Sequence, residues 1–353
     1  MLELDGGLEF DAAQAEGLFF PALPPRAAVC LIEARDEKAE PFLIRTQNLQ
    51  RRLQRLLGPL DPASKRLNLS EFARGIRYRL TNSAFEQALT YYQQARQLFP
   101  QRYRELMRLR PAAVLKVNLR NAYPRCYVTR RIPVDEAGLP TGGTYYGPFA
   151  SRRSAQAFAE RILDLFKVRR LVQFLDTSGG SLRSTMEEER ERASEQSDFE
   201  RAAAWHKKVE KLDEILRGRP ELTRRIQDLD AVILQPAAEE HTMGVYRVRG
   251  GRLAEPFFLR FAEIASQPRS AEQIFREHFE AVSGAAEGDL GEHLWLVARW
   301  YYSHPREGEI FFREKDWPYR RILRACSRLL APKTSQAETK PTPGPAQPPE
   351  GGP

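Results

Sequence analysis

The chain has 353 residues, carries a net charge of +8 with a pI near 9.4, and is 42% apolar. This length allows two or three domains, and the apolar fraction is large enough to give each a hydrophobic core. The sequence contains no apolar run long enough to predict a membrane-spanning helix. Because residues 1–5 are acidic where a secretion signal would be basic, we expect a soluble cytoplasmic protein with no membrane partner.

Cysteine and histidine are too sparse to predict a metal centre. Cys30, Cys126 and Cys326 lie far apart without CxxC spacing, and the five histidines form no HxxxH or HExxH pair. These spacings argue against a zinc site, an iron–sulfur cluster and a disulfide framework. We therefore predict no metal ion and no cofactor.

The basic character of the chain comes mostly from arginine. The planar guanidinium fits phosphate better than the lysine ammonium does, so a nucleic-acid partner is one interpretation of the charge. The other interpretation is a genome that encodes arginine wherever a solvated helix face needs charge. Composition alone does not choose between the two.

The first expected domain, residues 1–104, is a small α/β unit. Apolar segments at 26–35 and 41–44 predict two strands joined by a charged turn. Leucines at 49, 53, 56 and 57 form the stripe of an amphipathic helix within 46–57, which Gly58 and Pro59 end. A third strand is predicted over 75–80 and a second helix over 83–98.

The second expected domain, residues 105–176, is a basic segment of strands and one helix. Strands are predicted at 114–118 and 125–131, and a long helix at 154–167. Serine and glycine at 178–181 predict a linker. A highly charged helical hairpin is expected to follow at 183–218.

The last expected domain covers residues 222–330. Three strands are predicted, with the sequence RGGR at 249–252 as a hairpin turn, and three helices follow them. Residues 331–353 hold seven prolines and three glycines, and we expect them to be a disordered tail. The whole chain is therefore predicted to be a mixed α/β (α+β) protein. The predicted strands are 230–235, 244–249 and 257–261, and the helices are 271–282, 290–303 and 319–330.

The hairpin contains the most specific pattern in the sequence. Asp198 is placed to cap its second helix. A two-helix hairpin of this length cannot bury both faces by itself, so we expect it to dock on a partner or pair with a copy. The alternative is a linker hairpin that packs on its own domain. The apolar face available for docking comprises Phe199, Ala202, Ala203, Val209 and Leu212.

These residues resemble the UVR motif of the excinuclease subunits UvrC and UvrB, whose core reads M-x6-A-x4-(D/N)-F-E-x-A-A. Met186, Ala193 and the sequence DFERAA at 198–203 fit this pattern. In that family such hairpins pair with one another. The resemblance implies that UvrB, or another UVR-containing protein, is the partner, with Phe199 as the central anchor, since large aromatics concentrate binding energy.

The basic segment is similar to the UvrC family as well. The sequences YPRCYVTRR at 123–131 and YYGPFAS at 145–151 resemble the family's segment between its nuclease domain and its UVR hairpin. Arginines interleaved with tyrosines suit a surface that follows a nucleic-acid backbone. We therefore predict a DNA-binding surface, the alternative being tyrosines in a core and arginines that are only solvated. Its residues would be Arg125, Arg130, Arg131, Tyr145 and Tyr146.

The N-terminal unit resembles a GIY-YIG nuclease domain that lacks catalytic residues. By this resemblance Cys30 and Phe42 replace the two tyrosines, and Tyr92 replaces the metal-binding glutamate. Only Arg52 keeps its catalytic position. Phenylalanine cannot donate a proton, and tyrosine is a poor Mg²⁺ ligand beside a carboxylate. Glu86, the nearest acid, lies about one and a half helical turns before Tyr92.

Taken together, the resemblance covers roughly residues 22–282 and implies a UvrC-like protein of nucleotide-excision repair, without catalysis of its own. The family's cysteine cluster has no counterpart at 171–183. Residues 228–252 resemble the lead-in to the family's RNase-H-like nuclease, but the sequence after them does not resemble that nuclease or the helix-hairpin-helix repeats. Two alternatives stay open: an active Mg²⁺-dependent DNA endonuclease that makes a single incision, and a UVR-motif adaptor outside repair.

Overall fold

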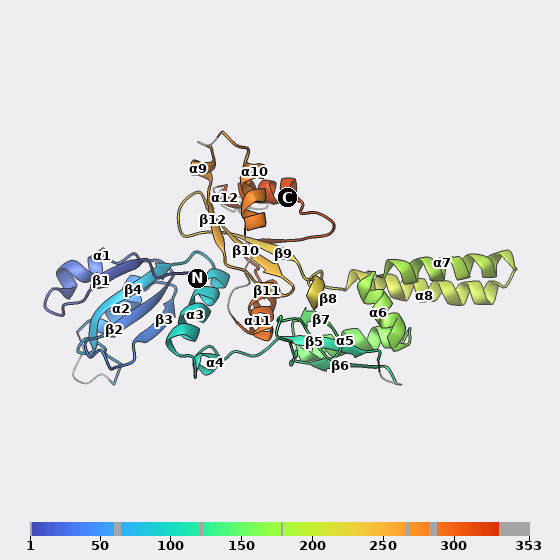
Figure 1. Cartoon of the computed structure of the whole chain (residues 1–353), viewed down its shortest axis with the longest axis horizontal. Helices are drawn as coiled ribbons and strands as arrows, with labels where there is room; N and C mark the ends of the chain where they lie inside the picture. The colour runs from blue at the N-terminus through green and yellow to red at the C-terminus, as the bar shows by residue number, and fades with distance from the viewer. Residues whose placement is uncertain are drawn as a thin grey trace, which may run out of the picture.

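The computed structural model describes residues 2–59, 65–120, 123–177, 179–265, 268–281 and 288–331. Within these ranges the chain forms three antiparallel sheets, helices that pack on them, and a long helical hairpin (Figure 1). This confirms the expected mixed α+β architecture. None of the helices in these ranges is both long enough and apolar enough to cross a membrane. Apart from Ala331, the predicted tail lies outside the described residues.

The first sheet has the strand order β1-β4-β2-β3 and carries helices on both faces. Alternation along β2 explains the two layers: Cys30 and Ile32 pack with Leu53 of α2, whereas Val29 and Leu31 pack in the cluster that contains α3. The predicted strands and helices of this unit are confirmed, with ends shifted by a few residues, but β1, η1 and α1 were not predicted. The elements are β1 (Gly6–Glu9), η1 (Ala15–Phe19), α1 (Phe20–Ala22), β2 (Ala28–Ala34), β3 (Phe42–Thr46), α2 (Leu49–Leu57), β4 (Ala73–Leu80) and α3 (Ala84–Leu98).

The second sheet has the order β6-β5-β7-β8, and α5 and α6 pack against one of its faces. The strand that contains the YYGPF sequence lies inside the sheet. The single helix expected at 154–167 is wrong in extent, because the chain ends α5 at Leu163 and begins a separate α6. Its elements, with α4 before them, are α4 (Tyr103–Leu106), β5 (Ala113–Asn118), β6 (Arg125–Thr129), β7 (Thr144–Phe149), α5 (Arg152–Leu163), α6 (Val168–Asp176) and β8 (Arg224–Arg225).

The hairpin consists of α7 (Gly180–Glu195) and α8 (Phe199–Arg217). The linker expected at 178–181 is therefore wrong for its second half, since Gly180 and Ser181 already belong to α7. Ser178 lies outside the described residues. Gly179 precedes them with a φ of 79°, a left-handed conformation that favours glycine. An added Cβ at Gly179 would also lie 2.5 Å from the Leu216 side chain, so both the turn and the packing require glycine here.

The third sheet follows the order β11-β10-β9-β13, with β12 paired to the other part of β10. The RGGR turn is confirmed: Arg249 pairs with Arg252, and Gly250 and Gly251 both have positive φ. β13 was not predicted, because it pairs with β9 from a distant part of the chain. The elements are η2 (Ile226–Asp228), β9 (Ala231–Pro236), β10 (Thr242–Arg249), β11 (Arg252–Leu253), β12 (Phe257–Arg260), α9 (Phe261–Ala265), α10 (Ala271–Ala281), α11 (Leu290–Tyr301), β13 (Glu309–Phe312) and α12 (Tyr319–Leu330).

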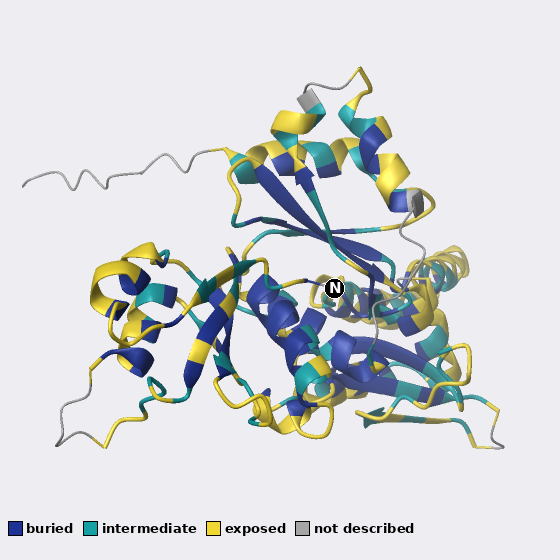
Figure 2. Cartoon of the chain, turned by 60° about the vertical axis from the view of Figure 1, so that its left-hand side comes forward, coloured by how far each residue is buried: buried dark blue, intermediate teal, exposed yellow. Residues whose placement is uncertain are grey.

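The expected N-terminal and C-terminal domains share one hydrophobic core through α3. Phe85 of α3 packs in the same buried cluster as Tyr246 of β10 and Trp300 of α11. The centroid of the Phe85 ring lies 5.2 Å from that of Tyr246 and 5.8 Å from that of Trp300. Figure 2 shows buried residues concentrated in the strands and in the helix faces turned toward them. The units 1–104 and 222–330 are therefore packed together.

Candidate functional site

The α7–α8 hairpin projects from the rest of the molecule, with its two helices side by side (Figure 1). Its first helix has 16 residues and is therefore about 24 Å long. The base is buried against the second sheet and its helices. Toward the tip, over residues 187–208, Ala193 is the one buried side chain. The structure thus anchors one end of the hairpin and exposes the other.

The turn at the tip is closed by backbone hydrogen bonds in the pattern of a Schellman motif. The amide of Asp198 donates to the carbonyl of Ala193, and the amide of Ser197 to that of Ser194, both at 2.9 Å. Asp198 Oδ1 accepts a hydrogen bond from the amide of Arg201 at 3.1 Å, which confirms the predicted cap. Ser197 has a φ of 57°, in the left-handed region that favours glycine.

Replacing Ser197 with glycine should stabilise the tip by about 0.5–1 kcal/mol, since the left-handed strain disappears. Hydrogen exchange at the amides of Ser197 and Asp198 should slow by roughly two- to five-fold. Ser194→Gly, within the last turn of α7, is the matched control and should speed exchange instead, because glycine weakens a helix. Faster exchange in both variants would contradict the assignment of strain to Ser197.

The base of the hairpin belongs to the protein's own core. Val209 and Leu212 are 5% and 0% exposed and pack in one cluster with side chains of α5 and α6. The prediction that these two residues contact a partner is therefore wrong. The apolar periodicity of α8 correctly predicted an apolar face, but the second domain covers the C-terminal half of that face.

The tip of the hairpin keeps the remaining predicted contact residues accessible. The Phe199 side chain is 72% exposed, Ala203 is exposed, and Ala202 is half-buried. Trp205 is half-buried beside them, with Lys208 Nζ 4.1 Å from its ring centroid. An ion pair from Arg201 Nη2 to Glu189 Oε2, at 3.4 Å, links the two helices near this end. The ion pair therefore stabilises the surface on which Phe199 lies, and the Phe199 ring is exposed and not packed on the chain itself.

The basic segment forms an exposed edge of the second sheet. Along β6, Cys126 and Val128 pack toward the cluster that contains α5, whereas Arg125 and Tyr127 alternate with them and are exposed. Arg130 and Arg131 follow the strand and are exposed as well. Within the described part of the chain, none of these three arginines forms an ion pair. We call Arg125, Tyr127, Arg130 and Arg131 the β6 surface.

Tyr145 and Tyr146 do not belong to this surface, and their predicted role as DNA contacts is wrong. They are 2% and 0% exposed. The Tyr145 hydroxyl donates to the Thr141 carbonyl at 2.9 Å, and that of Tyr146 to Asp176 Oδ1 at 2.7 Å. β7 runs between β5 and β8, so the two rings enter the cores on opposite faces of the sheet. The exposed aromatic side chains in this segment are Tyr127, which belongs to the β6 surface, and Tyr123, which precedes it.

The residues expected in the nuclease positions do not converge on one cleft. Cys30 is fully buried between β2 and α2, and burial raises the pKa of its thiol, so it stays protonated. Phe42 is 36% exposed on β3, and Arg52 is half-buried on α2. Tyr92 is 0% exposed and belongs to the cluster on the other face of the sheet. The structure thus separates Tyr92 from Cys30 by the sheet itself.

Tyr92 instead takes part in a buried polar cluster around Glu292 of α11. Its hydroxyl donates to Glu292 Oε2 at 2.7 Å, and that of Tyr103 donates to Glu292 Oε1 at 3.0 Å. Arg104 Nε donates to the same Oε1 at 2.6 Å. Burial raises the pKa of Tyr92, and the hydrogen bond to Glu292 raises it further. The cluster ties α3 and α4 to α11, so Tyr92 holds the expected domains together.

Glu292→Gln should therefore lower the free energy of unfolding by about 1–2 kcal/mol, because the buried hydroxyls and Arg104 lose a charged acceptor. Chemical denaturation would measure this change. Glu263→Gln, an exposed position on α9, is the control and should change stability by less than about 0.5 kcal/mol. Equal stabilities of the two variants would show that the Glu292 cluster does not hold the units together.

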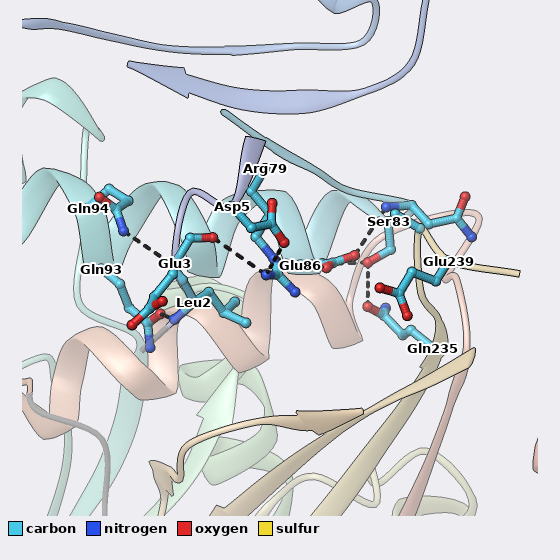
Figure 3. Close-up of polar contacts among 12 residues, drawn as sticks. Leu2, Glu3, Asp5, Arg79, Ser83, Glu86, Gln93, Gln94, Gln235 and Glu239 are labelled. Carbon is cyan, nitrogen blue, oxygen red and sulfur yellow. Dashed lines mark hydrogen bonds and ion pairs between the residues drawn. The ribbon is translucent and has the colours of Figure 1, made fainter. Parts of the chain in front are cut away.

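Glu86, the acid nearest to Tyr92 in the sequence, has a capping role at the start of α3 (Figure 3). Its Oε2 accepts a hydrogen bond from the Asn82 amide at 3.1 Å, and its own amide donates to Ser83 Oγ at 3.0 Å. Ser83 Oγ in turn donates to Gln235 Oε1 of the third sheet. Burial raises the pKa of Glu86, opposed by the Asn82 amide and by Arg79. Among the residues that the structure describes, no group of three or more His, Cys, Asp or Glu is arranged to hold a metal ion.

Glu292 was missed by the sequence analysis. A signal existed: it is the single carboxylate in the otherwise largely apolar segment LGEHLWLVARW at 290–300. An acid placed there has to be hydrogen-bonded when the helix is buried. Its partners lie 188 to 200 positions earlier in the chain, and nothing in the sequence pairs them.

Comparison with known proteins identifies the hairpin. Residues 180–215 match the family model of the UvrB/uvrC motif, UVR. No curated protein and no solved structure matches the chain significantly. The matched range contains all of α7, α8 except its last two residues, and the exposed Phe199. The match suggests an interaction of the UvrB/UvrC type, connected with DNA repair, and locates it on α7 and α8.

Proposed function

We propose that this protein is a non-catalytic, UvrC-like component of nucleotide-excision repair that binds the UVR hairpin of UvrB or of another UVR-containing protein. The observation that carries the proposal is the exposed aromatic at the tip of a matched UVR hairpin. A phenylalanine left 72% exposed costs hydrophobic free energy in the free protein. A partner that covers it recovers this free energy.

The anchored base supports the same proposal. Val209, Leu212 and Ile215 fix α8 to the body of the protein, and Arg183 Nε of α7 contacts Asp213 Oδ1 of α8 at 2.9 Å. The hairpin is therefore preorganised before it meets a partner. Preorganised surfaces lose less conformational entropy on binding, which favours affinity.

The charges near the tip suit a partner of the same construction. Over residues 187–195, α7 carries five acidic and two basic side chains, whereas over 199–211 α8 carries two acidic and four basic ones. One helix is therefore negative and the other positive. A second hairpin with the same division would place opposite charges against each other, which favours encounter and fixes orientation.

The β6 surface supports direct contact with DNA. Its three arginines have no acidic partner within the described chain, so their charge is available for phosphate groups, and exposed Tyr127 and Tyr123 offer faces for stacking. A UVR-motif adaptor outside repair would have no use for such a surface. Duplex binding therefore separates the repair assignment from that alternative.

The absence of catalysis is supported by the residues in the nuclease positions. Cys30 is buried, Tyr92 is bonded to Glu292, and Glu86 caps α3. Groups of a catalytic unit act together, so losing several removes nearly all rate enhancement. The proposal assigns this protein a binding role, without Mg²⁺ as a cofactor.

The deciding experiment is calorimetric titration of the full-length chain with the purified C-terminal hairpin of the cognate UvrB. We expect saturable binding at micromolar concentration. No heat of binding at high micromolar concentration would overturn the partner assignment. A nicking assay on damaged duplex with Mg²⁺, with and without UvrB, tests the second part: incision by the chain alone would overturn the non-catalytic role.

A further inference from the structure

A pocket of about 800 Å³ opens where α10 and the start of α12 meet β10. This volume is typical of sites for small ligands. Among the described residues that line it are two acids, Glu272 and Asp316, and three aromatic residues. They are far outnumbered by arginine: Arg247, Arg249, Arg276, Arg313, Arg320 and Arg321.

Arg247 is the buried member of this set. It is 7% exposed, and its Nε has no hydrogen-bond partner within the described structure. One of its terminal nitrogens donates to the Phe279 carbonyl, and its guanidinium lies 5.5 Å from the Phe279 ring centroid and 5.6 Å from that of Trp317. A buried cation without a directly bonded carboxylate is unfavourable unless an anion joins it.

The other arginines do not relieve this charge. Burial lowers the pKa of Arg247; Asp230 opposes the shift, but the neighbouring Arg249 and Arg313 lower the pKa further. Arg276 pairs with Glu272 at 3.3 Å, and Arg313 contacts Asp230 at 3.6 Å. Among the residues described, Arg249, Arg320 and Arg321 form no ion pair. Like charges therefore converge on a pocket whose own acids do not balance them.

The N-terminus of α12 adds positive potential to the same pocket. This 12-residue helix follows Pro318, has no side-chain cap and no acid in its first turn, and instead places Arg320 and Arg321 there. Helix N-termini attract anions and are ordinarily occupied by acidic or hydroxyl side chains. Basic residues at this end repel the helix dipole, and a bound anion would remove the repulsion.

We propose that this pocket binds the phosphate of a nucleotide, with the base stacked on Trp317 or Tyr319. Both aromatic side chains line the pocket and are half-buried. Arginine forks contact phosphate oxygens in pairs, and an adjacent aromatic face suits a base. The helices α10 and α12 that line the pocket lie apart from α7, α8 and β6 (Figure 1). The inference therefore does not depend on the proposed function. The phosphate belongs either to a free nucleotide or to the end of a nucleic-acid strand.

The test is calorimetric titration of the full-length chain with thymidine 5′-monophosphate, thymidine and inorganic phosphate. A second set compares a short oligothymidylate bearing a 5′-phosphate with one bearing a 5′-hydroxyl. We expect the phosphorylated member of each pair to bind more tightly, by about tenfold or more, since charged hydrogen bonds are lost without it. If the mononucleotide binds as tightly as the phosphorylated strand, the ligand of the pocket is a free nucleotide. If the phosphorylated strand binds clearly more tightly, the ligand is the end of a nucleic-acid strand.

The double variant Arg249→Gln/Arg320→Gln should remove that preference, and because both side chains are exposed its melting temperature should not change. Arg324→Gln, exposed on the same helix but outside the pocket lining, is the matched control and should bind as the unaltered chain does. The proposal is overturned if the double variant keeps the preference, or if no phosphorylated ligand binds. Inorganic phosphate binding as tightly as the mononucleotide would overturn the role of the aromatic residues.

Discussion

Replacing Phe199 with alanine should weaken binding of a UVR-containing hairpin about thirty-fold and leave the melting temperature of the free chain unchanged. An aromatic anchor at the centre of an interface contributes about 2 kcal/mol or more, which corresponds to that loss of affinity. The ring is 72% exposed in the structure, so its removal takes little packing from the chain itself. Calorimetry with the UvrB hairpin and a thermal melt on the same variant measure both quantities.

Two control variants separate recognition from folding. Leu18 is 67% exposed on η1, which directly precedes α1, and α1 lies at the opposite end of the molecule from the hairpin (Figure 1). Leu18→Ala should therefore change neither quantity. Leu212 is fully buried at the hairpin base, and Leu212→Ala should cost about 2–5 kcal/mol of stability. Its effect on binding should only follow the folded fraction. A Phe199→Ala variant that melts early, with affinity reduced only in proportion, would contradict the assignment of Phe199 to the interface.

Local signals in the sequence predicted the elements that local chemistry determines. The leucine stripe of α2 and the Asn48 side chain that caps it lie within one short segment, and so do Asp198 and the first turn of α8. The UVR pattern belongs to the same class, since its residues are spaced along one hairpin. Such features depend on neighbours within a few positions, and the structure contains them nearly where they were expected.

Features that depend on distant partners were predicted poorly. An alternation of tyrosine and basic residues looks the same in an edge strand and in a central one. β6 lies at the edge and exposes Tyr127, whereas β7 is covered on both faces and buries Tyr145 and Tyr146. Val209 was misassigned for a related reason, because the sequence did not show that the base of the hairpin packs in one cluster with α5 and the second sheet. Burial of an apolar face is predictable from sequence, but the identity of what covers it is not.

The dependence on distant partners also explains why the nuclease resemblance did not predict the surroundings of Tyr92. Strand and helix order from β2 to α3 followed the expected pattern, and Cys30, Phe42 and Arg52 lie on the two strands and the helix predicted for them. What the sequence did not predict was that α3 would be enclosed by the third sheet and α11. Tyr92 is therefore hydrogen-bonded to Glu292. The side of α3 that carries Tyr92 is buried in the protein core and does not line an open cleft.

Reversing Arg125, Arg130 and Arg131 to glutamate should lower affinity for duplex DNA by roughly 10²- to 10³-fold near 0.1 M salt. Each phosphate contact adds about 0.9 to the slope of log affinity against log salt, so losing three should flatten that slope by roughly two to three. The side chains are exposed and unpaired within the described chain, so the fold should not suffer. Fluorescence anisotropy over a salt series measures affinity and slope together.

The matched control reverses Arg51, Arg55 and Lys65, which are exposed in the N-terminal unit and change the net charge of +8 by the same amount. If DNA affinity depends only on the net charge of the protein, both triple variants should lose affinity equally. The β6 surface would then have no special role. If the β6 surface follows the backbone, the control should keep most of its affinity and its full slope, because charges beyond about a Debye length, roughly 10 Å at 0.1 M salt, are screened. If the DNA affinity of the unaltered chain is the same at low and at moderate salt, the chain makes no phosphate contacts. A local phosphate-binding surface requires that the slope of log affinity against log salt becomes flatter in the β6 variant and not in the control.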